Sequence, residues 1–187
     1  MTTQNNTAQD SKSVYGATPE NQEIESHTLS IFVDNESGVL ARVIGLFSGR
    51  GYNIESLTVA EIDHETNISR ITIVSSGTPQ VIAQIKHQLE RMVPVHKVFD
   101  LTVSGSHVSC ELALVKLLCT SAEQTKAAEV AKKYGATNID TTDNSVIFQI
   151  AGSTNDVEEF ITKMKPYNIA NISRTGTVAM MRGDVTL

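Results

Sequence analysis

Two asparagines and a glycine flank one predicted helix and could bind a small polar ligand. Asn35, Ser37 and Gly38 lie directly before this helix, and Asn53 lies directly after it. An asparagine amide can donate and accept hydrogen bonds, and Gly38 lacks a Cβ, so a ligand can approach the backbone there. The N-terminus of a helix also presents unpaired N–H groups and a positive dipole end, which attract an anion. We therefore take this region as the best candidate for a binding site, and we expect Asn53 to return towards Asn35 in space.

A purely structural role would explain the same residues. Asn and Ser are preferred at the N-cap of a helix, because their side-chain oxygens accept hydrogen bonds from first-turn N–H groups. On this interpretation Asn35 and Ser37 cap the helix and Asn53 forms a turn. The residue types alone leave both interpretations open.

The candidate site lies within residues 32–54, where a strand runs directly into a helix. The strand, residues 27–33, alternates apolar and polar side chains. The helix begins at Val39, and its apolar side chains fall on one face: Val39, Leu40, Val43, Leu46 and Phe47. Gly49 and Gly51 end the helix, since either can adopt the left-handed conformation that follows a helix.

The remainder of the first half completes a β-α-β-β-α-β order. Strands are predicted over 54–62 and 68–75 around a polar hairpin loop, 63–67. Thr78 as N-cap and Pro79 at the first position begin a second helix, which ends before Pro94. Its buried face is formed by Ile82, Ile85, Leu89 and Met92. Residues 95–103 form the fourth strand.

The second half repeats this order. Strand 112–119 precedes a helix that begins with a capping box of Ser121 and Gln124 and ends at Gly135. Strands 139–141 and 146–151 form a hairpin, a helix starts at Ser153 or Thr154, and residues 169–181 supply the last strand or two. The chain is therefore predicted to be α+β, with two tandem ferredoxin-like βαββαβ domains over 27–103 and 107–187. Residues 1–26 are polar and predicted to be a disordered tail.

Each predicted sheet has one face covered by two helices, so its other face needs a partner. We expect oligomerisation to supply that partner.

Composition excludes several classes of function. The chain has 187 residues, is 40% hydrophobic and carries a formal net charge of −6. No segment is basic, which argues against nucleic acid or an anionic membrane as the main partner. A nucleic-acid module of the same topology would need aromatic side chains on a central strand, and residues 67–75 contain none. The N-terminus resembles neither a signal nor a transit peptide, so we expect a cytoplasmic location.

The sequence also lacks the usual signals of catalysis and metal binding. Its five histidines show no metal-ligand spacing, and its glycines end a helix where a phosphate-binding loop would begin one. Cys110 and Cys119 lie on one predicted strand about 30 Å apart, too far for a disulfide. We expect both to be buried thiols in a reducing compartment.

Residues 28–102 resemble an ACT domain, a small module that binds amino acids and regulates metabolic enzymes. Within them, residues 29–60 closely resemble the regulatory small subunit of acetolactate synthase. The motifs are NESGVLARV at 35–43, GLFS at 45–48 and RGYNIESLTV at 50–59. A weaker resemblance continues through ELALVK at 111–116, RTG at 174–176 and RGD at 182–184. Only the tail departs from the family pattern.

The resemblance implies a non-catalytic partner of the large subunit of acetolactate synthase, a thiamine-diphosphate enzyme of branched-chain amino-acid synthesis. That enzyme condenses two pyruvates, or pyruvate with 2-oxobutanoate. Thiamine diphosphate, Mg²⁺ and FAD are expected in the catalytic partner, and no cofactor is expected in this chain. The subunit would form a homodimer through its ACT domains, stimulate the large subunit and confer feedback inhibition by valine. The alternative is a stand-alone ACT-domain sensor that acts on another enzyme or on a transcription factor.

The resemblance also assigns the effector site. Family positions fall on Asn35, Gly38 and Asn53, with neighbours Ser37, Val39, Leu40 and Ile54 lining the pocket. Burial of an isopropyl group in such a pocket is worth roughly 1.5–3 kcal/mol. Because one methylene changes binding by only about 1–3 kcal/mol, discrimination between valine, leucine and isoleucine is expected to be poor.

Overall fold

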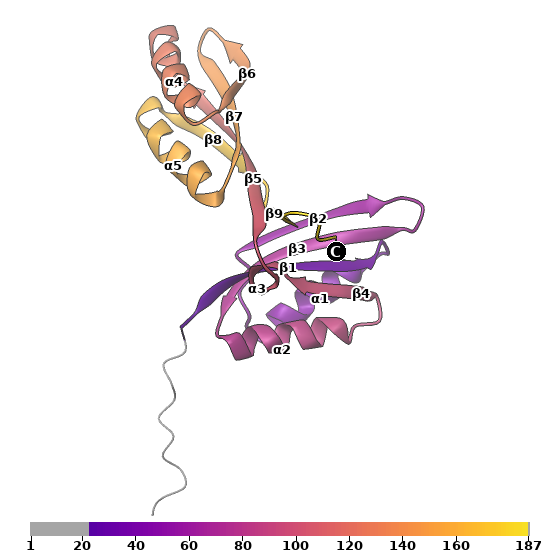
Figure 1. Ribbon diagram of the computed structural model, residues 1–187. Helices are drawn as coiled ribbons and strands as arrows, with labels where there is room; N and C mark the ends of the chain where they lie inside the picture. Colours follow the sequence, from indigo (N-terminus) through magenta and orange to yellow (C-terminus); the bar gives the residue numbers. More distant parts are fainter. Residues whose placement is uncertain (1–22, 187) are drawn as a thin grey trace, which may run out of the picture.

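The computed structural model describes residues 23–186 and has two lobes joined by one long strand (Figure 1). Most of the predicted tail, 1–26, lies outside the described residues. Strand β1 already begins at Glu25, so the last two residues assigned to the tail belong to the first sheet.

The first lobe is a four-stranded antiparallel sheet with two helices on one face (Figure 1). Its strands lie in the order β2-β3-β1-β4, which places β2 and β4 at the edges. The elements are β1 (Glu25–Asp34), α1 (Val39–Ser48), β2 (Ser56–Asp63), β3 (Ile68–Gly77), α2 (Pro79–Glu90) and β4 (Val95–Asp100).

The core of this lobe follows the predicted periodicities. Strand β1 alternates, and its inward side chains, Leu29, Ile31 and Val33, are at most 1% exposed. The buried stripes of α1 and α2 pack against them: Val39, Val43, Phe47, Ile82, Ile85 and Leu89. Burial of each large apolar side chain is worth about 1.5–3 kcal/mol. The side chain of Thr78 caps α2 and Pro79 begins it, as predicted.

The second lobe repeats the pattern with strand order β6-β7-β5-β8. Its elements are β5 (His107–Leu118), α4 (Ser121–Lys133), β6 (Thr137–Thr142), β7 (Ser145–Gly152), α5 (Thr154–Met164), η1 (Lys165–Tyr167) and β8 (Ile169–Arg174). Its core lies between this sheet and α4 and α5, around Phe148 and Phe160. The predicted α+β fold with two βαββαβ units is confirmed.

Two local predictions are wrong. Strand β4 ends at Asp100, and residues predicted to continue it form a short helix, α3 (Leu101–Ser104). The reason is that the Asp100 carboxylate accepts from Thr102 N–H at 3.0 Å and thereby caps α3. The capping box of α4 is formed by Thr120 and Glu123, one residue earlier than predicted.

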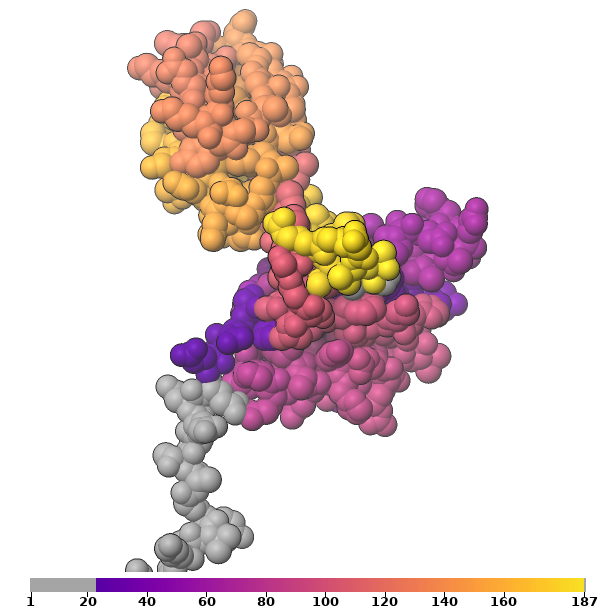
Figure 2. Space-filling model, viewed as in Figure 1, coloured from indigo at the N-terminus to yellow at the C-terminus, as the bar shows by residue number. Residues whose placement is uncertain are grey.

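The C-terminal segment returns to the first lobe. Strand β9 (Val178–Met181) pairs with the start of β5, from His107 to Cys110. In Figure 2 this yellow segment lies over the first lobe. Arg70 of β3 donates to the carbonyl oxygen of Ala179 at 2.6 Å, and a third apolar cluster joins Leu101, Ala179 and Met181. The open face of the first sheet, predicted to need another chain, is therefore partly covered by its own chain.

Two further features concern the environment of the chain. Cys110 is half-buried and Cys119 is buried, and both are free thiols. Between residues 23 and 186, no helix combines the length and the apolar character that crossing a membrane requires.

Candidate functional site

The candidate site begins at the junction of β1 and α1, which backbone hydrogen bonds hold in place. Asp34 N–H donates to the carbonyl oxygen of Pro94 at 2.9 Å, and Asn35 N–H donates to that of Asn67 at 2.7 Å. The Asp34 carboxylate also lies 2.6 Å from Nε2 of His96. The chain thus enters α1 from a fixed position, between the β2–β3 hairpin and the start of β4.

That hairpin is itself well ordered by one carboxylate. Asp63 accepts from Thr66 Oγ1 at 2.6 Å and from Glu65 N–H at 2.9 Å. These bonds, chiefly the one from the Thr66 hydroxyl, hold the pKa of the Asp63 carboxyl below its usual range. The polar loop predicted over 63–67 is therefore a closed turn, and it supports the position of Asn35.

The N-terminus of α1 is open to solvent. Gly38 is the N-cap, with φ 86° and ψ −6°, and no side chain caps the helix. The alternative interpretation, in which Asn35 and Ser37 cap α1, is therefore excluded, because Gly38 occupies the capping position and has no side chain to offer. A Cβ at Gly38 would meet no atom within 4 Å. Val39 N–H donates to the carbonyl oxygen of Glu36 at 3.4 Å, whereas no side chain caps the N–H groups of Leu40 and Ala41, which are thus available to an anionic group.

The predicted site residues at this end differ in their exposure. Asn35, Ser37 and Gly38 are exposed, and Leu40 is half-buried. Val39 is only 2% exposed and packs in the core of the first lobe. Its side chain therefore stabilises the fold and is not available to a ligand from solvent, and its backbone N–H already donates to the carbonyl oxygen of Glu36 at 3.4 Å.

Asn53 lies at the opposite end of α1. Its carbonyl oxygen accepts from Ser75 Oγ at 2.6 Å. Ser75 pairs with His27 at the start of β1, whereas Asp34 at the end of β1 pairs with Ile68. The seven steps from residue 68 to residue 75 span about 23 Å of strand. The expectation that Asn53 returns towards Asn35 within one chain is therefore wrong.

The reason lies in the connection between the two strands. Strands β1 and β2 both run antiparallel to β3, so they point in the same direction. In such a β-α-β unit the end of the first strand and the start of the second lie at opposite edges of the lobe. Asn53 is exposed and Ile54 half-buried at the second of these edges. The candidate residues of one chain thus form two separate groups, and we call these the candidate half-sites at the Asn35 end and the Asn53 end of α1.

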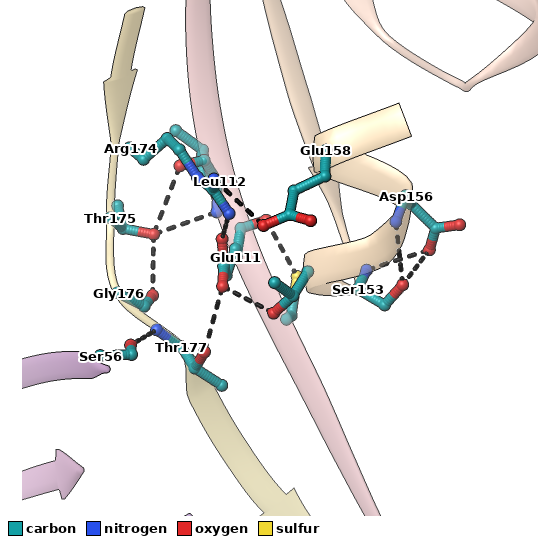
Figure 3. A network of polar contacts seen from close by, with 12 residues as sticks. Ser56, Glu111, Leu112, Ser153, Asp156, Glu158, Arg174, Thr175, Gly176 and Thr177 are labelled. Carbon is teal, nitrogen blue, oxygen red and sulfur yellow. Dashed lines mark hydrogen bonds and ion pairs between the residues drawn. The ribbon is translucent and has the colours of Figure 1, made fainter. Parts of the chain in front are cut away.

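Sequence reasoning missed a polar network where the two lobes meet (Figure 3). Glu111 of β5 is 5% exposed. Its carboxylate accepts from Thr154 Oγ1 at 2.6 Å, from Arg174 Nη2 at 2.5 Å and from Thr177 Oγ1 at 3.2 Å. Burial by itself would raise the pKa of the Glu111 carboxyl, but the hydrogen bonds from Thr154 and Arg174, with the Arg174 charge, outweigh it and lower the pKa.

A signal for this network was present in the sequence. Glu111 occupies the same alternating positions of β5 as Ala113, Val115 and Leu117, all of which are fully buried. A carboxylate at an inward-facing position needs hydrogen bonds and a cationic partner.

The chemistry available at the two half-sites is that of binding. Amide groups, uncapped N–H groups and half-buried Leu40 and Ile54 can together contact a ligand with a carboxylate, an ammonium and an apolar side chain. Within residues 23–186, no three His, Cys, Asp or Glu side chains are grouped so as to hold a metal ion.

Both halves of the chain match known families. Residues 29–97 match the family described as an AHAS small subunit-like ACT domain, and residues 110–183 match the one described as the small subunit of acetolactate synthase.

Relatives extend these matches over most of the chain. A probable acetolactate synthase small subunit from Archaeoglobus fulgidus is 38% identical, covering 84% of this chain and 98% of the relative. The small subunit of acetolactate synthase isozyme 3 from Escherichia coli is 40% identical, covering 83% and 95%. The crystal structure of the small subunit from Thermotoga maritima superimposes with a TM-score of 0.79 at 32% identity, over 86% of this chain and 99% of that one.

Proposed function

This chain belongs to the acetolactate synthase small-subunit family and is therefore the regulatory, non-catalytic subunit of that enzyme, and we propose that it senses valine at a site shared by two copies of the chain. In this proposal thiamine diphosphate, Mg²⁺ and FAD belong to the catalytic large subunit. This chain stimulates that partner, and valine inhibits it through the contacts that this chain makes. Both subunits act in the cytoplasm.

The observation that carries the proposal is the separation of Asn35 and Asn53 by the length of α1. A helix of ten residues is about 15 Å long, and a free valine is too small to reach both asparagines of one chain. Two chains related by a twofold axis perpendicular to α1 would run their helices in opposite directions. The Asn35 end of one chain would then lie beside the Asn53 end of the other.

Strand β2 offers a suitable edge for this arrangement. It is an outer strand of its sheet, so its outward N–H and C=O groups are free to pair with a second strand. Val59 and Ile62 of β2 are 47% and 51% exposed. Antiparallel pairing of β2 with its copy would join the two sheets and would place the start of one β2 beside the end of the other.

Each part of valine has a partner in the shared site. The carboxylate would bind at the open N-terminus of α1, beside Gly38, where the N–H groups of Leu40 and Ala41 have no capping side chain. The amides of Asn35 and of the second chain's Asn53 would accept from the ammonium. The isopropyl group would be covered by Leu40 and Ile54, which are half-buried in each chain, with a gain of roughly 1.5–3 kcal/mol.

Reconstitution with the large subunit tests the regulatory role. The small subunit should co-purify with it, raise acetolactate formation and make the reaction sensitive to valine. The small subunit alone should form no acetolactate from pyruvate with all cofactors supplied. Turnover by the isolated chain, or failure to bind the large subunit, would contradict the assignment.

Subunit complementation tests the shared site. Asn35→Ala and Asn53→Ala homodimers should each bind valine weakly, because every site lacks one amide. When the two variants are co-expressed, each mixed dimer regains one intact site, so about a quarter of all sites should bind valine with the wild-type affinity. Calorimetric titration of the mixture measures this fraction. If mixing restores no binding, each site lies within a single chain.

A further inference from the structure

Residues 175–177, between β8 and β9, connect the Asn53 half-site to the second lobe, and we call them the strap. We propose that the strap is the element through which effector binding at the first lobe changes the second lobe. This inference rests on the proposed function, because it concerns how a bound amino acid controls the holoenzyme.

On the first lobe, the strap is bound to the segment that follows Asn53. Thr177 N–H donates to Ser56 Oγ at 2.6 Å, and Thr58 Oγ1 donates to the carbonyl oxygen of Thr177 at 3.0 Å. Ser56 is three residues after Asn53. A shift of the backbone at Asn53 therefore reaches the strap through one short stretch of chain.

Gly176 makes this contact close. A Cβ at this position would lie 2.6 Å from the carbonyl oxygen of Leu57 and 2.8 Å from Ser56 Oγ. The strap and the start of β2 thus touch backbone to backbone, which no residue with a side chain would allow without displacement.

On the second lobe, the strap is bound to the base of β5. Thr175 N–H donates to the carbonyl oxygen of Leu112 at 2.9 Å, and Leu112 N–H donates to Thr175 Oγ1 at 3.0 Å. Thr177 Oγ1 donates to the buried carboxylate of Glu111, which also binds Arg174 and Thr154 at the start of α5 (Figure 3). The same three residues therefore bind β2 of one lobe and β5 of the other.

The first-lobe side of the strap is the one suited to open. Thr177 is joined to β2 by two hydrogen bonds that involve hydroxyl groups, and not by a strand ladder, whereas residues 111–118 of β5 are paired with β7. A polar cleft of about 700 Å³ borders the strap between Glu55 of the first lobe and Arg174 of the second. The lobes therefore have room to move relative to each other once the strap leaves β2.

The segment around Asn53 is fixed on its other side. The carbonyl oxygen of Asn53 accepts from Ser75 Oγ of β3, and Glu55 N–H donates to the carbonyl oxygen of Val74 at 2.9 Å. A ligand that draws Asn53 towards a second chain must therefore change the contacts of residues 53–58 with β3 or with the strap. The contacts with the strap are the ones that lead to another lobe.

The test separates effector binding from inhibition. Gly176→Ala should displace the strap, because the added Cβ clashes with the start of β2. The φ of Gly176 is not left-handed, so the alanine adds no backbone strain. Ser56→Ala removes the acceptor for Thr177 N–H without adding an atom. Ser109→Ala, at an exposed residue of β5, is the matched control for Ser56→Ala. Circular dichroism checks the fold of each variant, and Ser56→Ala carries the test should Gly176→Ala fail to fold.

We expect both strap variants to stimulate the large subunit. As free subunits, their affinity for valine should lie within about threefold of that of the wild type. In the holoenzyme, half-inhibition should need about 5–150-fold more valine, which is the usual range of coupling between two sites. Because linkage is reciprocal, adding the large subunit should change the valine affinity of the wild type and of Ser109→Ala, but not that of the strap variants.

Unchanged inhibition curves in the folded strap variants would overturn the inference, as would loss of valine binding by the free variants. The wild-type titrations test the proposed function separately: a wild-type subunit that neither stimulates the large subunit nor binds valine would overturn both.

Discussion

Replacement of Gly38 by aspartate is the most direct test of where the effector carboxylate lies. Gly38 has φ 86°, and a Cβ at this position would meet no atom within 4 Å. The Cβ of a new residue therefore meets no clash, and the conformational cost is the left-handed backbone, about 1–2 kcal/mol for most L-residues. Asn and Asp tolerate this conformation best. Gly38→Asn and Gly38→Asp thus share size and backbone cost and differ in one charge.

The effect of that charge can be estimated from Coulomb's law. Two like charges 4 Å apart repel by about 1 kcal/mol in bulk water and by about 4 kcal/mol at the effective dielectric constant of a protein surface. Beside a valine carboxylate on the first turn of α1, the aspartate would weaken binding by roughly 5-fold to 1,000-fold. The tethered carboxylate would also occupy the positive end of the helix itself.

The assay is a valine titration of the reconstituted holoenzyme with wild type, Gly38→Asn and Gly38→Asp. We expect all three to stimulate the large subunit, and the aspartate variant to require at least about 5-fold more valine than the asparagine variant for half-inhibition. Thermal unfolding of the three subunits controls for the fold. Coincident inhibition curves for the asparagine and aspartate variants would show that no anionic group of the effector lies near residue 38.

Three further predictions concern the network and the core of the second lobe. Glu111→Gln should lower the free energy of unfolding by about 1.5–3 kcal/mol, because Arg174 loses its buried charged partner. The side chain of Glu158 is 62% exposed and its carboxylate lies 3.8 Å from Arg174, so Glu158→Gln should change the free energy of unfolding by less than about 1 kcal/mol. Equal effects of the two in urea unfolding would contradict the network. The pKa of Glu111 is lowered on folding. Its contribution to stability should therefore be complete above the unfolded pKa of about 4.3 and should be lost as the pH falls through the lower folded pKa. From about pH 5 downwards, the free energy of unfolding should thus fall more for wild type than for Glu111→Gln. Phe160→Ala should cost about 3–5 kcal/mol, because Phe160 is fully buried beside Phe148, and a loss below about 1 kcal/mol in the same assay would mean that the core repacks.

The fold was predictable because periodicity reports burial directly. Leu29, Ile31 and Val33 alternate in the sequence and are buried on one side of β1. Thr78 and Pro79 begin α2 because one supplies an acceptor and the other needs no N–H partner. These signals are local, and nothing elsewhere in the chain competes with them.

Helix starts were less predictable where two registers satisfied the same rule. Thr120 with Glu123 and Ser121 with Gln124 both have the spacing of a capping box. The structure uses the first pair, in which the Glu123 carboxylate accepts from Thr120 N–H at 2.8 Å. This pair is favoured because a hydrogen bond to a charged group is stronger than one to a neutral amide. At α1 the capping position fell on Gly38, which left the neighbouring Asn35 and Ser37 free of that role.

The contacts of the C-terminus could not be predicted from local pattern. Residues 178–181 read as a strand, but no periodicity shows that they pair with the start of β5 and receive a hydrogen bond from Arg70. Such contacts join residues from 68 to 109 positions apart, and many partners would satisfy the same apolar pattern. The strap falls in this class, since Gly176 in the sequence gives no indication of the backbone that it touches.

In the proposed shared site, the placement of the two asparagines would make dimerisation and sensing one process. If each valine is held by the Asn35 end of one chain and the Asn53 end of another, a single chain offers only half of the hydrogen bonds and binds weakly. Effector binding then stabilises the dimer, and dimerisation strengthens effector binding by the same factor, because linkage is reciprocal. The free edge of β2 and the exposed Val59 and Ile62 would be covered in that dimer. Because Ser56 and Thr58 begin the same strand, the dimer edge, the Asn53 half-site and the strap all meet on β2, which is the shortest route from a bound amino acid to the second lobe.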